Sequence, residues 1–255
     1  MKEIRDFIVT ERLNPGDNYA CLRLTAADGK RLPEILPGQF VQVAVDTKGV
    51  FLRRPISICD VDYETSSITL LVRNAGKATK VLTEIAEGAT LNLILPLGNG
   101  FDTELPAGSR VLLVGGGVGV APLLYLGRVL SGKGFDVEYL SGARSTGDLL
   151  LTERFEEFGK LHLCTEDGSA GTRGFVTAHE VLSRQFDRVY CCGPAPMMKA
   201  VAAKAKATGC DCEVSLENMM ACGLGACLCC VEKTVKGNVC VCTEGPVFNI
   251  NQLTW

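Results

Sequence analysis

Six of the thirteen cysteines in this 255-residue chain lie in one short stretch near its C-terminus. Three of them, Cys222, Cys227 and Cys230, have the spacing C-x4-C-x2-C, and Cys240 and Cys242 follow downstream. This is the ligand spacing of plant-type [2Fe–2S] centres, which thiolates hold. The glycines between the first two cysteines let a loop wrap closely around such a centre. The stretch therefore predicts a small cluster module and, since a cluster carries single electrons, a redox partner elsewhere in the chain.

The residues alone leave two ligand assignments open. Cys230 preserves two residues after Cys227, whereas Cys229 would leave one, and spacing does not separate Cys240 from Cys242 as the fourth ligand. A four-cysteine zinc site is the structural alternative, but such sites often pair two short C-x2-C arms. The longer first spacing and the single arm favour iron–sulfur.

Composition narrows the setting of this module. The N-terminus has no apolar signal-peptide segment, so we expect a cytoplasmic protein whose cysteines are ligands rather than disulfides. A net charge of −3 provides no basic surface for nucleic acid or an anionic membrane. The longest uncharged run, 111–127, is broken by five glycines and Pro122, and is too short to span a bilayer.

The first part of the chain, 1–100, predicts an antiparallel β-barrel. Short, partly alternating apolar segments are separated by turn signals such as Asp28-Gly29 and Pro37-Gly38, a pattern typical of small barrels. One helix is expected at about 79–86. The expected strands include 19–25, 39–45, 67–73 and 90–95.

From 101 to 216 the pattern changes to short apolar strands that alternate with helical segments. This predicts a doubly wound parallel α/β domain, which binds ligands at the carboxyl ends of its strands. The remaining residues, 217–255, form the cluster module. The expected strands are 111–114, 136–140, 161–164, 188–192 and 212–216, and the expected helices lie near 121–131, 148–158, 175–185 and 195–207.

Two turns of the α/β domain indicate a nucleotide site. Gly115, Gly117, Gly119 and Pro122 follow its first strand and open a helix, where backbone N–H groups can approach a pyrophosphate. The run departs from G-x-G-x-x-G by its final proline, and glycines there also serve packing alone. Another turn after the fourth strand could flank a nicotinamide, or could be an ordinary buried thiol and helix start; it comprises Cys192, Gly193 and Pro194.

A barrel strand is expected to end at the short motif Arg54, Pro55, Ile56 and Ser57. An arginine can bind a diphosphate and a hydroxyl can bind the edge of a ring. Taken alone, the motif is more simply a solvated arginine in a turn.

Together and in this order, these motifs resemble the ferredoxin–NADP reductase superfamily, which joins a flavin barrel to a pyridine-nucleotide domain. In that superfamily R-x-x-S binds FAD, G-x-G-x-x-P meets the nucleotide and C-G-P flanks the nicotinamide. The run from Met220 to Cys227, with Cys242-Thr-Glu-Gly-Pro-Val-Phe248, is similar to the family of electron-transfer subunits of class 1B dihydroorotate dehydrogenases. The resemblance covers the whole chain.

The resemblance implies the cofactors and their residues. FAD would be bound by Arg54 to Ser57 and by two further segments, one of which departs from the family pattern at Ala78, where a glycine is common. The last cluster ligand in the family precedes an acidic-Gly-Pro-Val-Phe run, which selects Cys242 over Cys240. The two further FAD segments comprise Leu71, Val72, Arg73, Ala78 and Thr79.

The resemblance also implies a relay without acid–base catalytic residues. Electrons from a separate FMN-containing subunit that oxidises dihydroorotate would pass through the [2Fe–2S] cluster and FAD to NAD⁺, in a heterotetramer with two of each subunit. Because a plant-type cluster at roughly −400 mV would be an uphill acceptor, the relay predicts a less negative potential. Glu166 and Asp167 favour NAD over NADP, whereas Arg144 and Arg173 could oppose that preference.

Two other functions compete with this one. Another flavin reductase with a cluster, such as the small subunit of an NADH-dependent ferredoxin:NADP oxidoreductase, would share the same order of modules. A zinc-stabilised binding module without catalysis would be colourless and would contain no FAD.

Overall fold

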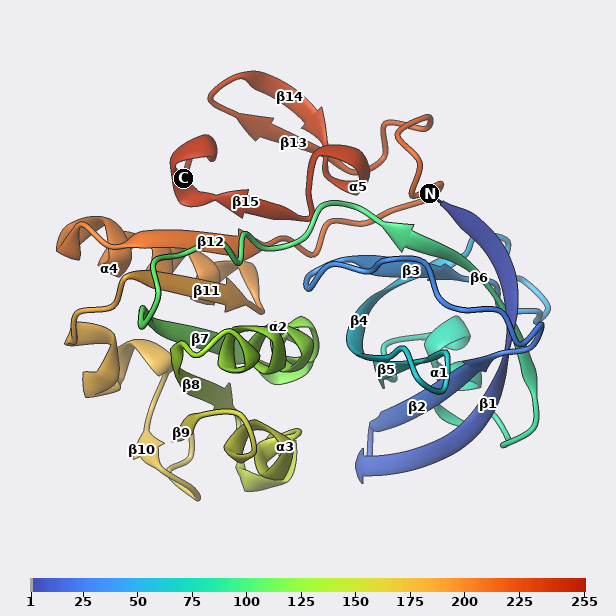
Figure 1. The fold of residues 1–255 in the computed structure, drawn as a ribbon, viewed down its shortest axis with the longest axis horizontal. Coiled ribbons are helices and arrows are strands. Elements are labelled where there is room, and N and C mark those ends of the chain that lie inside the picture. The colour runs from blue at the N-terminus through green and yellow to red at the C-terminus, as the bar shows by residue number, and fades with distance from the viewer. Residues whose placement is uncertain (1) are drawn as a thin grey trace.

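The computed structural model describes residues 2–255, and three structural parts follow one another along the chain. Figure 1 shows the N-terminal barrel beside the central α/β sheet, with the cysteine-rich segment lying above both. No helix among residues 2–255 is long and apolar enough to cross a membrane.

The N-terminal part is a closed antiparallel barrel, as predicted, with the strand order β1-β2-β5-β4-β3-β6. Alternate residues of β2 are buried, because successive side chains of a strand point to opposite faces. A short helix, α1 (Lys77–Thr83), follows β5 and begins slightly before the predicted position. The strands are β1 (Glu3–Gly16), β2 (Tyr19–Ala26), β3 (Phe40–Val43), β4 (Arg54–Asp62), β5 (Ser67–Arg73) and β6 (Thr90–Leu97).

The central part is a sheet with the order β10-β9-β8-β7-β11-β12-β15, parallel except at β15, with helices on both faces. Apolar residues of α2 (Ala121–Gly132) and α3 (Thr152–Glu156) pack on one face, and those of α4 (Ala195–Thr208) pack on the other. This confirms the predicted α/β class. Its parallel strands are β7 (Arg110–Gly116), β8 (Asp136–Ala143), β9 (Lys160–Thr165), β10 (Thr172–Arg173), β11 (Arg188–Cys192) and β12 (Asp211–Ser215).

Two local predictions were wrong. The expected helix at 175–185 is instead two 3-10 turns, Val176–Ala178 and Glu180–Ser183, separated at His179, whose ring accepts a bond from the Val181 amide. The β-branched residues of this segment favour α-helix only weakly. Arg54 begins β4 rather than ending a strand, so its motif lies at the entry to that strand.

The cysteine-rich segment forms a hairpin and then joins the central sheet. The hairpin strands are β13 (Val231–Thr234) and β14 (Gly237–Cys240), followed by the short helix α5 (Val241–Glu244). Strand β15 (Val247–Asn249) then pairs antiparallel with β12, and the 3-10 turn Ile250–Gln252 follows it. The cluster segment is therefore attached to the α/β sheet by backbone hydrogen bonds.

Ion pairs and one buried hydroxyl hold the barrel against the α/β part. Asp60 of β4 accepts hydrogen bonds from Arg128 of α2, at 2.7 and 3.0 Å, and lies 3.3 Å from Arg154 of α3. The Tyr125 hydroxyl donates to the Ile35 carbonyl at 3.1 Å. These contacts fix the two parts that face the site described next.

Candidate functional site

A cavity of about 330 Å³ opens where the barrel, the α/β sheet and the cysteine-rich segment meet. Each part contributes to its wall, so the cavity exists only in the assembled chain. Its size is suited to a flat aromatic ring system with a few polar contacts, as cofactor pockets generally are. The lining residues are Phe40, Pro55, Ile56, Ser57, Leu71, Arg73, Ala75, Val118, Ala121, Ser215, Leu216, Glu217, Asn218, Met220 and Pro246.

The barrel wall of the cavity contains most of the predicted flavin motif. Pro55, Ile56 and Ser57 line it from β4, and Leu71 and Arg73 line it from β5. Val72 and Ala78 are placed differently, because their side chains are buried in the barrel core. Only their backbone is therefore available to a ligand.

The two adjacent arginines before this wall have different environments. Arg53 donates to the carbonyls of Gln42 and Asn92, at 3.2 and 3.0 Å, and to the Asn92 side chain at 2.5 Å. Arg54 donates only to the neighbouring carbonyls of Leu52 and Arg53, at 2.7 and 3.3 Å. Both bonds use a single Arg54 nitrogen, so the remaining donors of its fork can bind a phosphate.

The Thr79 hydroxyl is engaged in the turn that precedes α1. It accepts a bond from the Ala75 amide at 2.9 Å and donates to the Gly76 carbonyl at 3.0 Å. These bonds shape the turn next to Ala75, which itself lines the cavity. Thr79 therefore contributes to the site first through the turn geometry.

Glu217 lies on the opposite wall, just after β12. Its side chain is exposed and lines the cavity. The surrounding protein atoms partly desolvate the Glu217 carboxyl and raise its pKa, and the charge of Arg73 acts in the opposite direction. Glu217 and Arg73 therefore place opposite charges along one pocket.

The predicted glycine-rich turn and the Cys-Gly-Pro turn pack against each other. A Cβ atom on Gly119 would lie 2.5 Å from the Gly193 Cα and 2.7 Å from the Cys192 carbonyl oxygen. One on Gly116 would lie 2.6 Å from the Met197 sulfur. Only glycine permits this approach, which brings the start of α2 to the carboxyl ends of β7 and β11.

Members of these two turns have different degrees of access to the cavity. Val118 and Ala121 line it, whereas Gly115, Gly117, Gly119 and Pro122 lie around them in the same turn. Cys192 is buried and pairs with Ser215 on the neighbouring strand β12. Burial raises the pKa of the Cys192 thiol well above its usual range. A neutral thiol is therefore expected there.

The cysteine-rich loop contains backbone donors directed at three of the predicted ligand sulfurs. The Leu224 amide donates to the Cys222 sulfur at 3.3 Å, and the Gly225 amide donates to the Cys242 sulfur at 3.1 Å. The Cys242 amide donates to the Cys230 sulfur at 3.4 Å. Amides arranged in this way stabilise thiolates, which are the form that binds iron.

The pKa values of the thiols follow these surroundings. The Leu224 amide is the main reason that the pKa of Cys222 falls to about 6. Burial raises the pKa of Cys242 to about 12, with the Cys230 thiol adding to the effect. The Cys222 thiol is thus largely ionised near neutral pH, whereas the Cys242 thiol would have to lose a proton in order to bind a metal.

The predicted donor set consists of four free thiols, and thiolates are the usual ligands of [2Fe–2S] centres. Within residues 2–255, no three His, Cys, Asp or Glu side chains converge on one point that could hold a metal ion. A [2Fe–2S] core is shared among four thiolates, two on each iron, so it does not require such a point. Cys240 lies beside the set, with its sulfur 3.9 Å from the Gly225 carbonyl oxygen, and Cys229 is exposed.

Sequence reasoning missed several residues of the cavity wall. Ser215, Leu216, Glu217 and Asn218 lie at the carboxyl end of β12, where a parallel sheet is expected to bind ligands. That rule could have identified them. Phe40 and Pro246 had no such signal, because they reach the cavity only through packing between distant segments.

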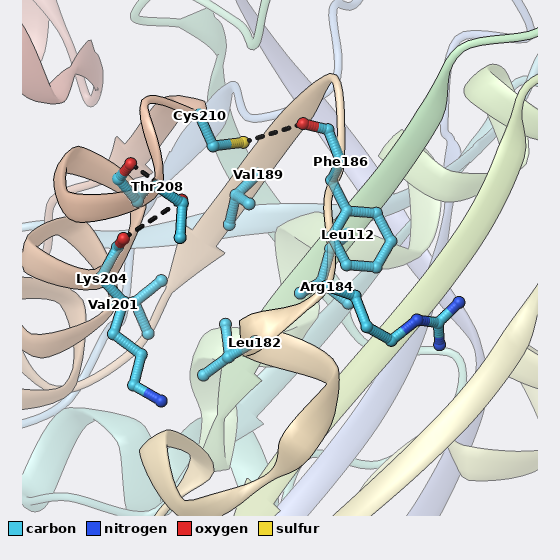
Figure 2. A pocket seen from close by; sticks show the side chains of 10 residues that line it. Leu112, Leu182, Arg184, Phe186, Val189, Val201, Lys204, Thr208 and Cys210 are labelled. Carbon is cyan, nitrogen blue, oxygen red and sulfur yellow. Dashed lines mark hydrogen bonds between the residues drawn. The ribbon is translucent and has the colours of Figure 1, made fainter.

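A second hollow lies far from this site, between α4 and the segment before β11 (Figure 2). Its volume is about 10 Å³, room for about one water molecule. The Cys210 thiol beside it donates to the Phe186 carbonyl at 3.1 Å. It is a packing defect rather than a ligand site.

Two family models match separate parts of the chain. The iron-sulfur cluster binding domain of dihydroorotate dehydrogenase B matches residues 217–254. The oxidoreductase NAD-binding domain matches residues 113–203. These matches fall on the cysteine-rich segment and on the parallel sheet.

Solved structures share the fold of most of this chain. A structure of an NADH-dependent reduced ferredoxin-NADP oxidoreductase is 30% identical, with a TM-score of 0.87, and the match covers 98% of this chain and 90% of that one. The FAD/NAD-binding domain of nitric oxide dioxygenase from Vibrio cholerae is 22% identical with a TM-score of 0.71, covering 82% of this chain and 98% of that one. The second likeness concerns the fold alone.

Curated relatives are more similar in sequence. The electron transfer subunit of dihydroorotate dehydrogenase B (NAD(+)) from Shouchella clausii is 42% identical over 226 residues, which are 85% of this chain and 86% of that protein. The corresponding subunit from Listeria monocytogenes serotype 4a is 38% identical over 231 residues, 89% of this chain and 90% of that one. The chain therefore belongs to the family of electron transfer subunits of NAD⁺-dependent dihydroorotate dehydrogenase B.

Proposed function

We propose that this chain transfers electrons between a dihydroorotate-oxidising catalytic subunit and NAD⁺, using FAD and a [2Fe–2S] cluster. The observation that carries the proposal is the cavity shared by the barrel, the nucleotide sheet and the cluster segment. When bound, the cluster would carry single electrons, and FAD would convert between single-electron transfer and hydride transfer. The chain itself positions these groups.

Within this proposal, each structural part holds one redox group. We assign 1–100 to FAD, 101–216 to NAD and 217–255 to the cluster. Ser57 and Leu71 line the flavin pocket, and Arg54 has free donors for the pyrophosphate. The glycine-rich turn and the Cys192-Gly-Pro194 turn bring NAD⁺ to the same cavity, because the two turns touch.

The proposed cluster ligands are Cys222, Cys227, Cys230 and Cys242, which single substitutions can test. Cys242→Ser should lose iron, because this buried sulfur accepts the Gly225 amide within the ligand loop. Cys240→Ser and Cys229→Ser are matched controls that should keep it. Iron content and the EPR signal of the reduced protein provide the measurement, and iron retained by Cys242→Ser but lost by Cys240→Ser would reverse the assignment.

The catalytic partner is proposed to carry FMN and to assemble with this chain as two copies of each. Exposed apolar side chains surround the ligand loop, namely Met219, Leu224 and Leu228. A partner seated on them would lie next to the cluster, with the flavin cavity on the other side. Light scattering of the co-purified complex tests the stoichiometry.

The competing oxidoreductase cannot be separated from this one by fold, since its structure matches over nearly the whole chain. Sequence separates them, because identity is higher to the dihydroorotate dehydrogenase B subunits. The choice between partners is therefore tested by which catalytic subunit restores turnover.

Titration of the purified chain with NADH tests the proposal without any partner. We expect FAD with about two irons per flavin, bleaching of the flavin band, and an EPR signal of a reduced cluster. The same titration with NADPH is the control, and we expect the flavin band to bleach far more slowly at an equal concentration of reductant. A colourless protein with stoichiometric zinc would contradict the proposal.

A further inference from the structure

One buried polar side chain, Gln42, lies at the boundary between the barrel and the cluster segment. Gln42 lies in β3, whose alternate residues Val41 and Val43 face the barrel core. Phe40 faces outward, into the cluster of apolar residues that contains Cys230 and Cys242. By the period of a strand, Gln42 shares that outward face.

Gln42 is fully buried, and neither its Nε2 nor its Oε1 atom has a hydrogen-bond partner. In the described part of the chain, it is the only side chain with two such atoms. A buried amide without partners is costly, so its retention calls for a partner that protein atoms do not supply.

The amide is directed at the cluster loop. A Cβ atom on Gly223, the residue after Cys222, would lie 2.7 Å from Gln42 Cγ and 2.8 Å from Gln42 Nε2. Gly223 also has a φ of 71°, which favours glycine. The loop thus passes directly over the end of the Gln42 side chain, where any larger residue would be excluded.

We propose that Gln42 is a positioning residue of the iron–sulfur centre: its Nε2–H group donates a hydrogen bond to a sulfur atom of the centre beside Cys222. The proposal rests on the ligand assignment above. Hydrogen bonds to the sulfurs are one of the factors that set the potential of such clusters. A donor stabilises the more negative, reduced state, so Gln42 raises the potential.

This contact would also give the relay a direct structural link. Gln42 pairs with Pro55 of the flavin motif on the neighbouring strand β4, and Phe40 on the same face lines the flavin cavity. One strand therefore contacts both proposed redox sites. The less negative cluster potential that the relay needs is then partly a property of β3.

The test compares Gln42→Met with the wild type in the full chain carrying FAD and the cluster. Methionine keeps the size of the side chain but has no donor. We expect the midpoint potential of the cluster, monitored by EPR, to shift to more negative values. The equilibrium constant for its reduction should fall by up to about tenfold, which corresponds to about 59 mV for a one-electron couple. Ile94→Val, at the residue paired with Gln42, is the control for packing and should leave the potential unchanged.

An unshifted potential in Gln42→Met with a full iron content would overturn the proposal, while the proposed function would stand. A wild type without iron would instead refute the ligand assignment. If Gln42→Met loses its iron, pulsed EPR decides with wild-type protein that carries ¹⁵N in its glutamine side chains. A coupled ¹⁵N nucleus near the reduced cluster supports the proposal, and no coupling refutes it.

Discussion

At the scale of single residues, the neighbouring arginines Arg53 and Arg54 have different roles: Arg53 stabilises the barrel, and Arg54 has donors available to a ligand. Arg53 connects β3 and β6 through the Gln42 carbonyl and Asn92, whereas Arg54 donates hydrogen bonds to the adjacent carbonyls of Leu52 and Arg53. The same residue type therefore stabilises the barrel at one position and remains available to a ligand at the next.

This division predicts different outcomes for the two alanine variants. Arg54→Ala should weaken FAD binding about tenfold to hundredfold, because a hydrogen bond to a charged phosphate is lost, and should leave the apoprotein Tm unchanged. Arg53→Ala should lower the Tm, at a cost of about 1–3 kcal/mol. Fluorescence titration with FAD and thermal unfolding measure the two effects. Equal loss of FAD affinity in both variants would refute the distinction.

Sequence predicted the chemistry of the site residues better than their orientation. Ser57, Leu71 and Arg73 line the cavity as the motif indicated, but Val72 and Ala78 face the barrel core. Successive side chains of a strand point to opposite faces, so Val72 points away from the face of β5 on which Leu71 and Arg73 lie. The motif identifies the segment, and the register decides which side chains reach the ligand.

At the scale of elements, the approach of two turns defines the nucleotide end of the cavity. The Gly119 position lies against the backbone of Cys192 and Gly193, which cannot move aside as a flexible side chain could. The relative position of the starts of α2 and α4 therefore depends on the absence of a Cβ atom at Gly119.

Gly119→Ala should separate these turns and reduce NADH-dependent turnover about tenfold to hundredfold. The clash should also destabilise the fold by about 1–3 kcal/mol. Gly132→Ala, at the end of α2, is the matched control, because nothing lies within 4 Å of its added Cβ atom. Turnover that survives in Gly119→Ala would show that the close approach is not needed for nucleotide binding.

A second element-scale prediction concerns β12. Burial raises the pKa of Glu213 from 4.5 to about 7, opposed by Arg188, which also pairs with Asp102 and Asp211. The folded state therefore binds this proton more tightly than the unfolded state, and stability decreases as the pH rises from about 4.5 to 7.

The Glu213→Gln variant has no carboxyl that titrates at this position, so it does not lose stability as the pH rises. The glutamine oxygen can still accept the hydrogen bond that the Asp102 amide donates at 3.0 Å in the wild type. We expect the variant to be more stable than the wild type at pH 8, by on the order of 1–3 kcal/mol, and equal to it near pH 4.5. Thermal unfolding at both pH values measures the difference. Parallel pH profiles would show that Glu213 does not titrate as described.

The order of elements was predictable because the hydrophobic period changes near residue 100. Every expected strand of the α/β part is present, since short apolar runs between turn signals have few alternatives. The segment 175–185 was not predictable in the same way. Its apolar residues suit a buried helix, but the His179 ring competes for the Val181 amide and interrupts it.

At the scale of the whole molecule, function depends on how distant segments meet. The cavity takes residues from β4 and β5, from the turn before α2, from the end of β12 and from the cysteine-rich segment. Strand β15 fastens that segment to the sheet. Sequence indicated one redox site in each part, whereas wall residues such as Phe40 and Pro246 reach the cavity only through packing between the modules.

The proposed electron-transfer function is tested by measuring NAD⁺ reduction by dihydroorotate in the presence of a dihydroorotate dehydrogenase B catalytic subunit. We predict turnover only when this chain, loaded with FAD and iron, is mixed with that subunit, and none with either protein alone. The Cys242→Ser variant should not support turnover, because it lacks the cluster. Dihydroorotate oxidation by this chain alone, or no NAD⁺ reduction by the fully loaded pair, would contradict the account.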